Sequence, residues 1–198
     1  MTTTILFVRH VPHEHQDKVH VSRTDGVRLA ADAPERLARL AARFLREDLA
    51  AVYASPVSRA IETASAATQR PVSAIGVRED FTEIEFGEWT GQKTDAVDRD
   101  PRHKVWNNVR SLARPPGGGE TMLEVQARMM HGVEAIRREH PDQTVAVFSH
   151  GDPIKCAILY LLGMPLDFYD RIDVDPGSIT TTVVGDWGAR VIRLNEAA

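Results

Sequence analysis

The stretch that decides the fold is Ile5-Leu6-Phe7-Val8-Arg9-His10, four apolar residues followed by an arginine and a histidine. A short apolar run of strand-forming residues predicts a buried strand. Two further runs have this character, Ala51-Val52-Tyr53-Ala54 and Val145-Ala146-Val147-Phe148, and the second leads into Ser149-His150. The sequence therefore predicts three buried strands, two of which end at a histidine.

Outward from these strands, apolar residues at helical spacing predict the helices that connect them. Helices are predicted over about 34–45, 56–69, 120–140 and 151–162, weaker strands over 72–75 and 81–84, and a closing hairpin over 179–184 and 190–194. Ser55 and Pro56 suit the N-cap and the first position of the second helix, and Gly163 suits the C′ position of the last one.

Strands alternating with helices indicate an α/β fold, a three-layer α/β/α sandwich with a mostly parallel central sheet. In such sheets, ligands bind outside the carboxyl ends of the strands. His10 and His150 both follow predicted strands, so we expect them to share one site at that edge. No repeat or linker divides the chain, and residues 1–198 are predicted to form a single domain with a small lid at 92–119.

Composition excludes several classes of protein. The chain has 198 residues, 42% hydrophobic and 26% charged, with a formal net charge of −4. These values are typical of a soluble globular protein and lack the basic excess that binds nucleic acid or an anionic membrane. Cys156 is the only cysteine, which excludes an internal disulfide and a cysteine-rich metal site, and its apolar surroundings predict a buried, inert thiol. With no signal peptide or membrane-spanning run, a cytoplasmic protein is the expectation.

The residues at the predicted strand ends and helix starts suit a phosphoryl group. Arg9 and Arg59 supply guanidinium forks, which bind phosphate oxygens in pairs and stay charged. A helix that starts at Gly151 offers free N–H groups and a positive dipole end. His10 is the predicted nucleophile, kept neutral by the neighbouring cations. Glu83 is the predicted acid for the leaving oxygen, provided that burial raises its pKa.

Six segments carry a family resemblance. They are Leu6-Phe7-Val8-Arg9-His10, Ser22-Arg23-Thr24-Asp25, Ser55-Pro56-Val57-Ser58-Arg59-Ala60-Ile61-Glu62-Thr63-Ala64, Phe81-Thr82-Glu83-Ile84-Glu85-Phe86-Gly87-Glu88-Trp89-Thr90-Gly91, Gly118-Gly119-Glu120-Thr121 and Val147-Phe148-Ser149-His150-Gly151-Asp152. In order and spacing they resemble the motifs of the histidine phosphatase superfamily, in its phosphoglycerate mutase-like branch. Together they span nearly the whole chain.

The resemblance implies a phosphoglycerate mutase-like fold and a phosphomonoesterase that needs neither a metal nor a cofactor. The catalytic set that it implies is His10, Glu83, His150, Arg9 and Arg59. In that set His10 is phosphorylated, and Glu83 first protonates the leaving oxygen and later activates water. The substrate-binding set that it implies is Arg9, Gln16, Ser22, Arg23, Arg59, His150 and Gly151.

Three positions depart from the family pattern. Val11 stands where a small residue, most often glycine, is usual, and its β-branched side chain is expected to restrict the approach of the backbone to the phosphate. His13 replaces the usual threonine, and Gln16 replaces the usual asparagine while keeping an amide donor. These changes leave the core chemistry intact and bear on hydrogen bonds to the substrate.

Three alternatives stay open. A metal-dependent hydrolase would use the histidines and carboxylates of one segment, although their spacing fits no metal motif. These residues are His10, His13, Glu14, His15, Asp17 and His20. A non-catalytic phosphate-binding module would use the same pocket, but all five catalytic positions are filled. A mutase-type phosphotransferase would form the same phosphohistidine; family mutases tend to be longer, so the phosphatase is favoured.

The predicted lid is rich in cations. It holds Lys93, Arg99, Arg102, His103, Lys104, Arg110 and Arg114 against Asp95, Asp98 and Asp100. A basic lid would recruit a substrate with a second anionic group, although a solvated helix face is the commoner role of such residues. Trp89 and Trp106 are expected in the core rather than the pocket. The expected partner is a small phosphorylated metabolite, not nucleic acid or membrane, and a homodimer through a sheet edge or the lid is compatible with the sequence.

Overall fold

A six-stranded sheet forms the centre of the computed structural model, which describes residues 1–198. The strands are β1 (Thr2–Arg9), β2 (Leu49–Ala54), β3 (Gly76–Val77), β4 (Thr144–Ser149), β5 (Ile179–Gly185) and β6 (Gly188–Glu196). Their order is β3-β2-β4-β1-β5-β6. The first four strands of that order run parallel. At one edge β5 pairs antiparallel with β1, and β6 pairs antiparallel with β5. The predicted α/β class with a mostly parallel sheet is confirmed.

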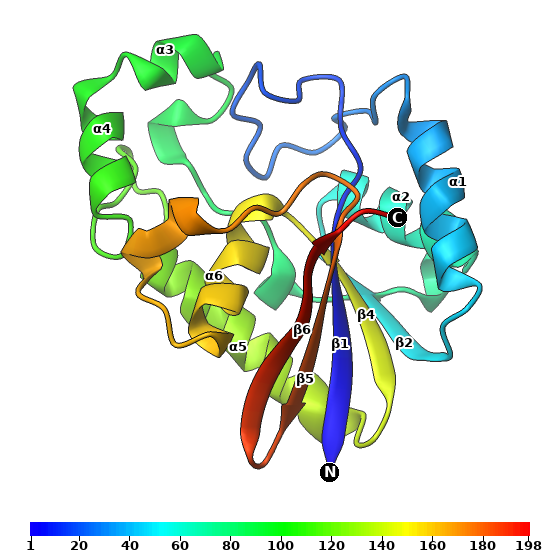
Figure 1. The fold of residues 1–198 in the computed structure, drawn as a ribbon. Coiled ribbons are helices and arrows are strands. Elements are labelled where there is room, and N and C mark those ends of the chain that lie inside the picture. Colours follow the sequence, from blue (N-terminus) through cyan, green and yellow to red (C-terminus); the bar gives the residue numbers. More distant parts are fainter.

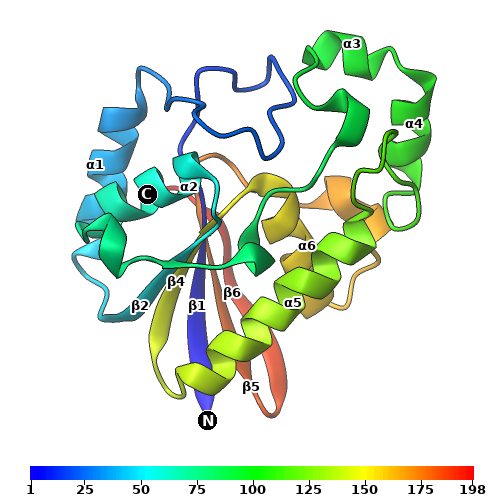
Figure 2. The same cartoon turned by 180° about the vertical axis from the view of Figure 1, so that it is seen from behind.

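Helices cover both faces of this sheet (Figures 1 and 2). The long ones are α1 (Ala33–Phe44), α2 (Ser58–Thr68), α5 (Met122–Glu139) and α6 (Gly151–Leu161). Figures 1 and 2 show α1 and α2 on one face and α5 and α6 on the other, which makes the three predicted layers. None of the helices combines the length and the apolar character needed to cross a membrane.

The two cores explain why β1 is apolar at successive positions. Ile5 and Phe7 lie in the core shared with α5 and α6, whereas Leu6 and Val8 lie in the core shared with α1 and α2. Successive side chains of a strand point to opposite faces, so a strand covered on both sides is apolar without alternation. The same burial applies to β4, and Cys156 is also buried, as predicted.

Three local predictions are wrong. Ser55 is not the N-cap of α2, because the helix begins at Ser58 after an extended Val57; the Ser55 hydroxyl accepts from the Val57 amide instead. The segment 81–84 is not a strand, since a 3-10 helix over Glu79–Phe81 leads into extended chain outside the sheet. Two of its carbonyls accept from serine hydroxyls: Phe81 from Ser149 and Ile84 from Ser22. Backbone groups satisfied in this way need no strand partner.

The weak strand predicted over 72–75 is also wrong. This segment forms a 3-10 helix over Val72–Ala74, and the two-residue strand β3 follows it at Gly76. Gly76 is required there, because a Cβ would come within 2.6 Å of the Tyr53 ring on β2. The sheet therefore ends at a very short edge strand.

The segment predicted to be a lid holds two short helices, α3 (Thr94–Asp98) and α4 (Pro101–Asn108), and lies toward the carboxyl end of the parallel strands (Figure 1). Trp106 of α4 and Trp89, just before this segment, are both buried, as expected, and their rings meet edge to face. The Trp89 indole donates to Asp100, whose carboxylate also pairs with Arg102. Burial of the Trp106 indole of α4 against Trp89 fixes this segment to the body of the protein.

Candidate active site

A cavity of about 220 Å³ opens at the carboxyl edge of the parallel strands. It is lined by Arg9, His10, His13, Gln16, Asp17, Val19, His20, Val21, Ser22, Arg59, Glu83, Phe86, Thr94, Gly151 and Asp152. Most of the residues singled out from the sequence therefore come together around one space. Two do not line it: His150 is fully buried behind the wall, and Arg23 lies on the outer side.

His10 follows β1 directly and is only 2% exposed. Its Nδ1 lies 2.7 Å from the carbonyl oxygen of Val11, which only accepts, so Nδ1 carries the proton. Nε2 is then an unprotonated nitrogen, and Arg59 donates to it from Nε over 3.2 Å. Burial, then the guanidinium groups of Arg59 and Arg9, hold the pKa of His10 well below the ordinary histidine value. The imidazole is thus neutral, and its Nε2 lone pair accepts from Arg59 at the wall of the cavity.

Arg59, in the first turn of α2, is the centre of the polar contacts and is 1% exposed. Its Nη2 donates to the carbonyl of Ser22 over 2.8 Å and lies 3.2 Å from Nδ1 of His150. The same Nη2 is 3.8 Å from a carboxylate oxygen of Glu83. One guanidinium therefore fixes the relative positions of two imidazoles and a carboxyl group.

Arg9 supplies a second guanidinium with a donor to spare. Its Nη1 donates to the carbonyl of Val174 over 2.7 Å, while its buried Nε has no partner. Gly151 packs against this guanidinium, since a Cβ at that position would lie 3.2 Å from Cζ of Arg9. Gly151 also begins α6, whose first amides have no partner within the helix. Gly151 and Asp152 line the same cavity, and free amides at a helix start suit an anion.

His150 supports the site from behind. Its Nε2 lies 2.7 Å from the Ser55 hydroxyl, and its ring centroid lies 5.2 Å from that of His10. Burial, then the charge of Arg59, holds the pKa of His150 well below the ordinary value, so it too is neutral. Ser55, which the sequence indicated as a helix cap, thereby orients an imidazole.

Glu83 is a buried carboxyl group between Arg59 and His150. Its Oε2 lies 3.5 Å from Nδ1 of His150, and its Oε1 accepts from the Ile84 amide over 2.9 Å. Burial, and the nearby carboxylate of Asp152, raise the pKa of Glu83 to about 7. A group with such a pKa both gives and accepts a proton near neutrality.

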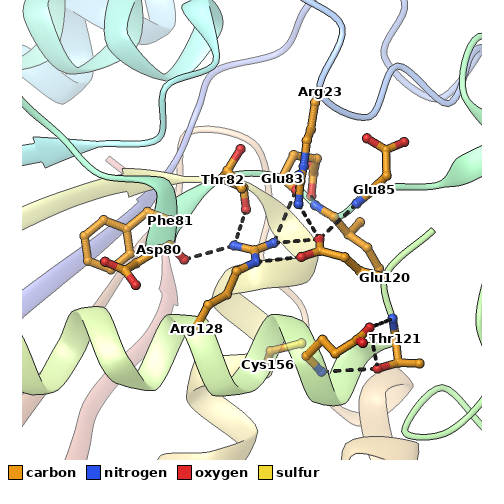
Figure 3. A network of polar contacts seen from close by, with 12 residues as sticks. Arg23, Asp80, Phe81, Thr82, Glu83, Glu85, Glu120, Thr121, Arg128 and Cys156 are labelled. Atoms are coloured by element: carbon orange, nitrogen blue, oxygen red, sulfur yellow. Dashed lines mark hydrogen bonds and ion pairs between the residues drawn. The ribbon is translucent and has the colours of Figure 1, made fainter. Parts of the chain in front are cut away.

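A polar network holds the backbone that carries Glu83 (Figure 3). From α5, Arg128 donates to the carbonyls of Asp80, Thr82 and Glu83 over 2.9, 2.7 and 3.2 Å. Arg23 donates to the same Glu83 carbonyl over 2.8 Å, and Glu120 pairs with both arginines. Sequence reasoning missed Arg128, because nothing in a helical sequence shows that one arginine reaches three carbonyls more than forty positions earlier in the chain.

The departures from the family pattern lie at the entrance and the rear of the cavity. Val11 does not obstruct it: the side chain is buried in the core with α1 and α2, and the amide donates to the Thr63 hydroxyl over 3.3 Å. His13 and Gln16 line the cavity. The histidines and carboxylates of residues 10–20 bring no three potential ligands together, so the segment does not form the metal site considered above.

The chain belongs to the histidine phosphatase superfamily, branch 1, whose family profile matches residues 5–197. The family resemblance is thereby confirmed. Phosphoserine phosphatase 1 of Hydrogenobacter thermophilus is 28% identical over 200 residues, covering 96% of this chain and 91% of that protein.

Two further proteins are similar to this chain, one over nearly its whole length and one over part of it. The structure of Bacillus stearothermophilus YhfR matches with a TM-score of 0.88 at 26% identity, over 99% of this chain and 98% of that one. The bifunctional protein Rv2228c of Mycobacterium tuberculosis is 32% identical over 151 residues, which are 75% of this chain and 41% of that protein. This chain thus spans about two fifths of that longer relative.

Proposed function

We propose that this protein hydrolyses a small phosphomonoester in two steps, with a phosphohistidine on Nε2 of His10 as the intermediate. The observation that carries the proposal is the state of that nitrogen. The Val11 carbonyl holds the proton on Nδ1, which leaves Nε2 unprotonated, and Nε2 accepts from Arg59. His10 lines the cavity together with Arg9 and Arg59. A neutral imidazole nitrogen is the nucleophile that attack on phosphorus needs.

In the first step, the Nε2 lone pair of His10 forms a bond to phosphorus while the ester P–O bond breaks. The Glu83 carboxyl group gives its proton to the departing oxygen, so the product is an alcohol. Arg59 then donates to phosphoryl oxygens in place of Nε2, and Arg9 adds its unpartnered Nε. Charge neutralisation and positioning of this kind supply most of the catalysis in phosphoryl transfer.

In the second step, the Glu83 carboxylate takes a proton from water, and the water oxygen attacks phosphorus. The N–P bond breaks, its electrons return to Nε2, and inorganic phosphate leaves. Glu83 is again protonated and His10 again neutral, so the cycle closes without a metal or a cofactor. A pKa of about 7 for Glu83 allows both halves of the cycle near neutral pH.

Hydrolysis is preferred to a mutase-type transfer because water needs no second substrate-binding position. The aligned Hydrogenobacter relative is named a phosphoserine phosphatase and covers nearly the whole chain, which supports the same preference. A phosphotransferase would pass the phosphoryl group from His10 to a second hydroxyl group. It would therefore show little release of phosphate in water alone.

The decisive experiment is hydrolysis of para-nitrophenyl phosphate in excess chelator by the wild type, His10→Ala and His15→Ala. We expect activity in the wild type and in His15→Ala, whose exposed side chain does not line the cavity, and none in His10→Ala. Rapid quenching should trap an acid-labile phosphoryl group on the wild type and on His15→Ala, but not on His10→Ala. Activity that disappears in chelator would instead point to a metal enzyme, and a stable, inactive wild type would favour a transferase or a binding module.

A further inference from the structure

The part of the cavity beyond the phosphoryl site contains no positive charge. Among the residues that line the whole cavity, the only cations are Arg9 and Arg59, and both are assigned to binding the phosphoryl group. Two further carboxylates line the cavity: Asp17, and Asp152, which accepts from the Tyr169 hydroxyl. A second anion on the substrate would therefore meet negative charge and no partner.

The cations of the predicted lid do not fill this gap. Arg102 pairs with Asp100 and Glu88, and Arg114 pairs with Glu124. Arg110 stacks over the rings of Trp106 and Tyr169. None of these arginines lines the cavity, so the idea that a basic lid recruits a second anionic group has no support in the structure.

The histidines at the mouth are uncharged. Burial, then the charge of Arg59, lowers the pKa of His13 to about 4, and burial also lowers the pKa of His20. His13 is only 6% exposed, and its Nδ1 accepts from the backbone amide of His15 over 3.3 Å. The proton of His13 is therefore on Nε2, which makes no hydrogen bond within the protein. His13 lines the cavity. His13 thus offers the leaving group one neutral donor.

We propose that this cavity selects phosphomonoesters whose leaving group is a small polar alcohol bearing an amino group rather than a second anion. This inference rests on the proposed function and names the class of substrate for the same site. Arg9, Arg59 and His10 bind the phosphoryl group, and the neutral His13 donates a hydrogen bond to the alcohol portion of the substrate. The ammonium group faces Asp17 at the mouth, where the Gln16 amide already donates to the carboxylate over 2.8 Å.

The test uses three esters of equal length that differ in one terminal group. They are phosphoethanolamine, 2-hydroxyethyl phosphate and phosphoglycolate, which end in an ammonium, a hydroxyl and a carboxylate group. We expect kcat/KM to fall in that order, with phosphoethanolamine at least about tenfold above phosphoglycolate. Equal values, or a preference for phosphoglycolate, would overturn the inference.

Asp17→Asn isolates the charge. Asp17 has a φ of 61°, a conformation that asparagine also adopts readily, so the backbone should be preserved. The ratio of kcat/KM for phosphoethanolamine to that for phosphoglycolate should fall about fivefold in this variant. Asp48→Asn, at an exposed carboxylate before β2, should leave the ratio unchanged. An unchanged ratio in Asp17→Asn would overturn the assignment of the ammonium position.

The experiment separates two kinds of failure. If para-nitrophenyl phosphate is not hydrolysed at all, the proposed function fails. If para-nitrophenyl phosphate is hydrolysed through His10 while phosphoglycolate is the best of the three esters, the proposed phosphatase function holds and only the proposed substrate class is wrong.

Discussion

Nε of Arg59 lies 3.2 Å from Nε2 of His10 and donates to it, although Arg59 comes from α2 and His10 follows β1. This one contact has two effects on the imidazole. The positive charge disfavours a second proton on the ring, and the hydrogen bond holds the orientation of the ring through its Nε2 lone pair. A phosphoryl group that enters the cavity takes over the arginine and leaves Nε2 free to attack.

Replacing Arg59 with alanine should therefore raise KM and lower kcat together. We expect kcat/KM to fall by about 10²–10³, because a charge-assisted donor to the developing transition state is lost. Arg59→Lys should recover little, since an ammonium group cannot make the paired contacts of the guanidinium fork. Steady-state kinetics on para-nitrophenyl phosphate measure this. The control is Arg39→Ala on α1, which removes an exposed ion pair with Glu35. An unchanged kcat/KM in Arg59→Ala would show that Arg59 does not belong to the site.

Glu83→Gln should distinguish good from poor leaving groups. An alkyl phosphate needs a proton on its departing oxygen, so we expect its kcat/KM to fall by about 10²–10⁴. Para-nitrophenolate leaves without one, and its ester should lose far less in the first step. Measurement of phosphohistidine formation in single turnovers, with both esters, makes the comparison. Equal losses for the two esters would show that Glu83 is not the acid.

The pH dependence of kcat/KM should also show that Glu83 acts as the acid. Because the pKa of Glu83 is raised to about 7, its protonated form declines as pH rises through that value. The kcat/KM of an alkyl phosphate should then fall above about pH 7, and this limb should be absent in Glu83→Gln. On the acid side, the lowered pKa of His10 keeps the nucleophile neutral well below the pH at which an ordinary histidine protonates. A profile that declines below pH 6.5 as a single histidine titration would contradict this.

Features of the fold and of the site could be predicted from the sequence where their physical cause is local. His10, His150 and Gly151 follow from strand ends, because parallel strands in register bring their carboxyl ends to one edge; Arg9 and Ser149 are paired directly. The two cores likewise follow from apolar runs in β1 and β4. These features depend on periodicity and on the geometry of a parallel sheet.

The features that sequence reasoning missed depend on distant partners. The segment before Glu83 has strand-like residues, yet it lies outside the sheet because hydroxyls and Arg128 satisfy its backbone. Ser55 has the residue type of a helix cap, yet it serves His150, 95 positions away. A residue type predicts a local hydrogen bond only when no better-placed distant partner competes for it.

Arg128 should act as a positioning residue for Glu83. Arg128→Met keeps much of the side-chain volume but releases three carbonyls, so Glu83 should lose its fixed placement. We expect kcat for an alkyl phosphate to fall about tenfold or more, with a smaller loss for the aryl ester and a displaced basic limb in the pH profile. A purely structural role would lower the melting temperature and affect both esters equally. Arg114→Met, which removes an exposed ion pair with Glu124, is the matched control.

The raised pKa of Glu83 also has a consequence for stability. The folded protein holds a proton on Glu83 up to about pH 7, whereas an unfolded glutamate releases it near 4.5. Between these values the folded state binds more protons, so this group makes the free energy of unfolding fall as pH rises. The total effect is at most roughly 3 to 4 kcal/mol, since each pKa unit corresponds to about 1.4 kcal/mol.

Glu83→Gln should abolish this dependence, because glutamine has no proton to lose. The variant should therefore gain stability relative to the wild type as pH rises from 5 to 8, even though it loses activity. Urea unfolding of both proteins across that range measures the difference. His10 and His150, whose lowered pKa values act in the opposite sense, are present in both proteins and largely cancel. Parallel stability curves would mean that Glu83 titrates as an ordinary carboxyl group, and the acid role assigned to it near neutral pH would lose its physical basis.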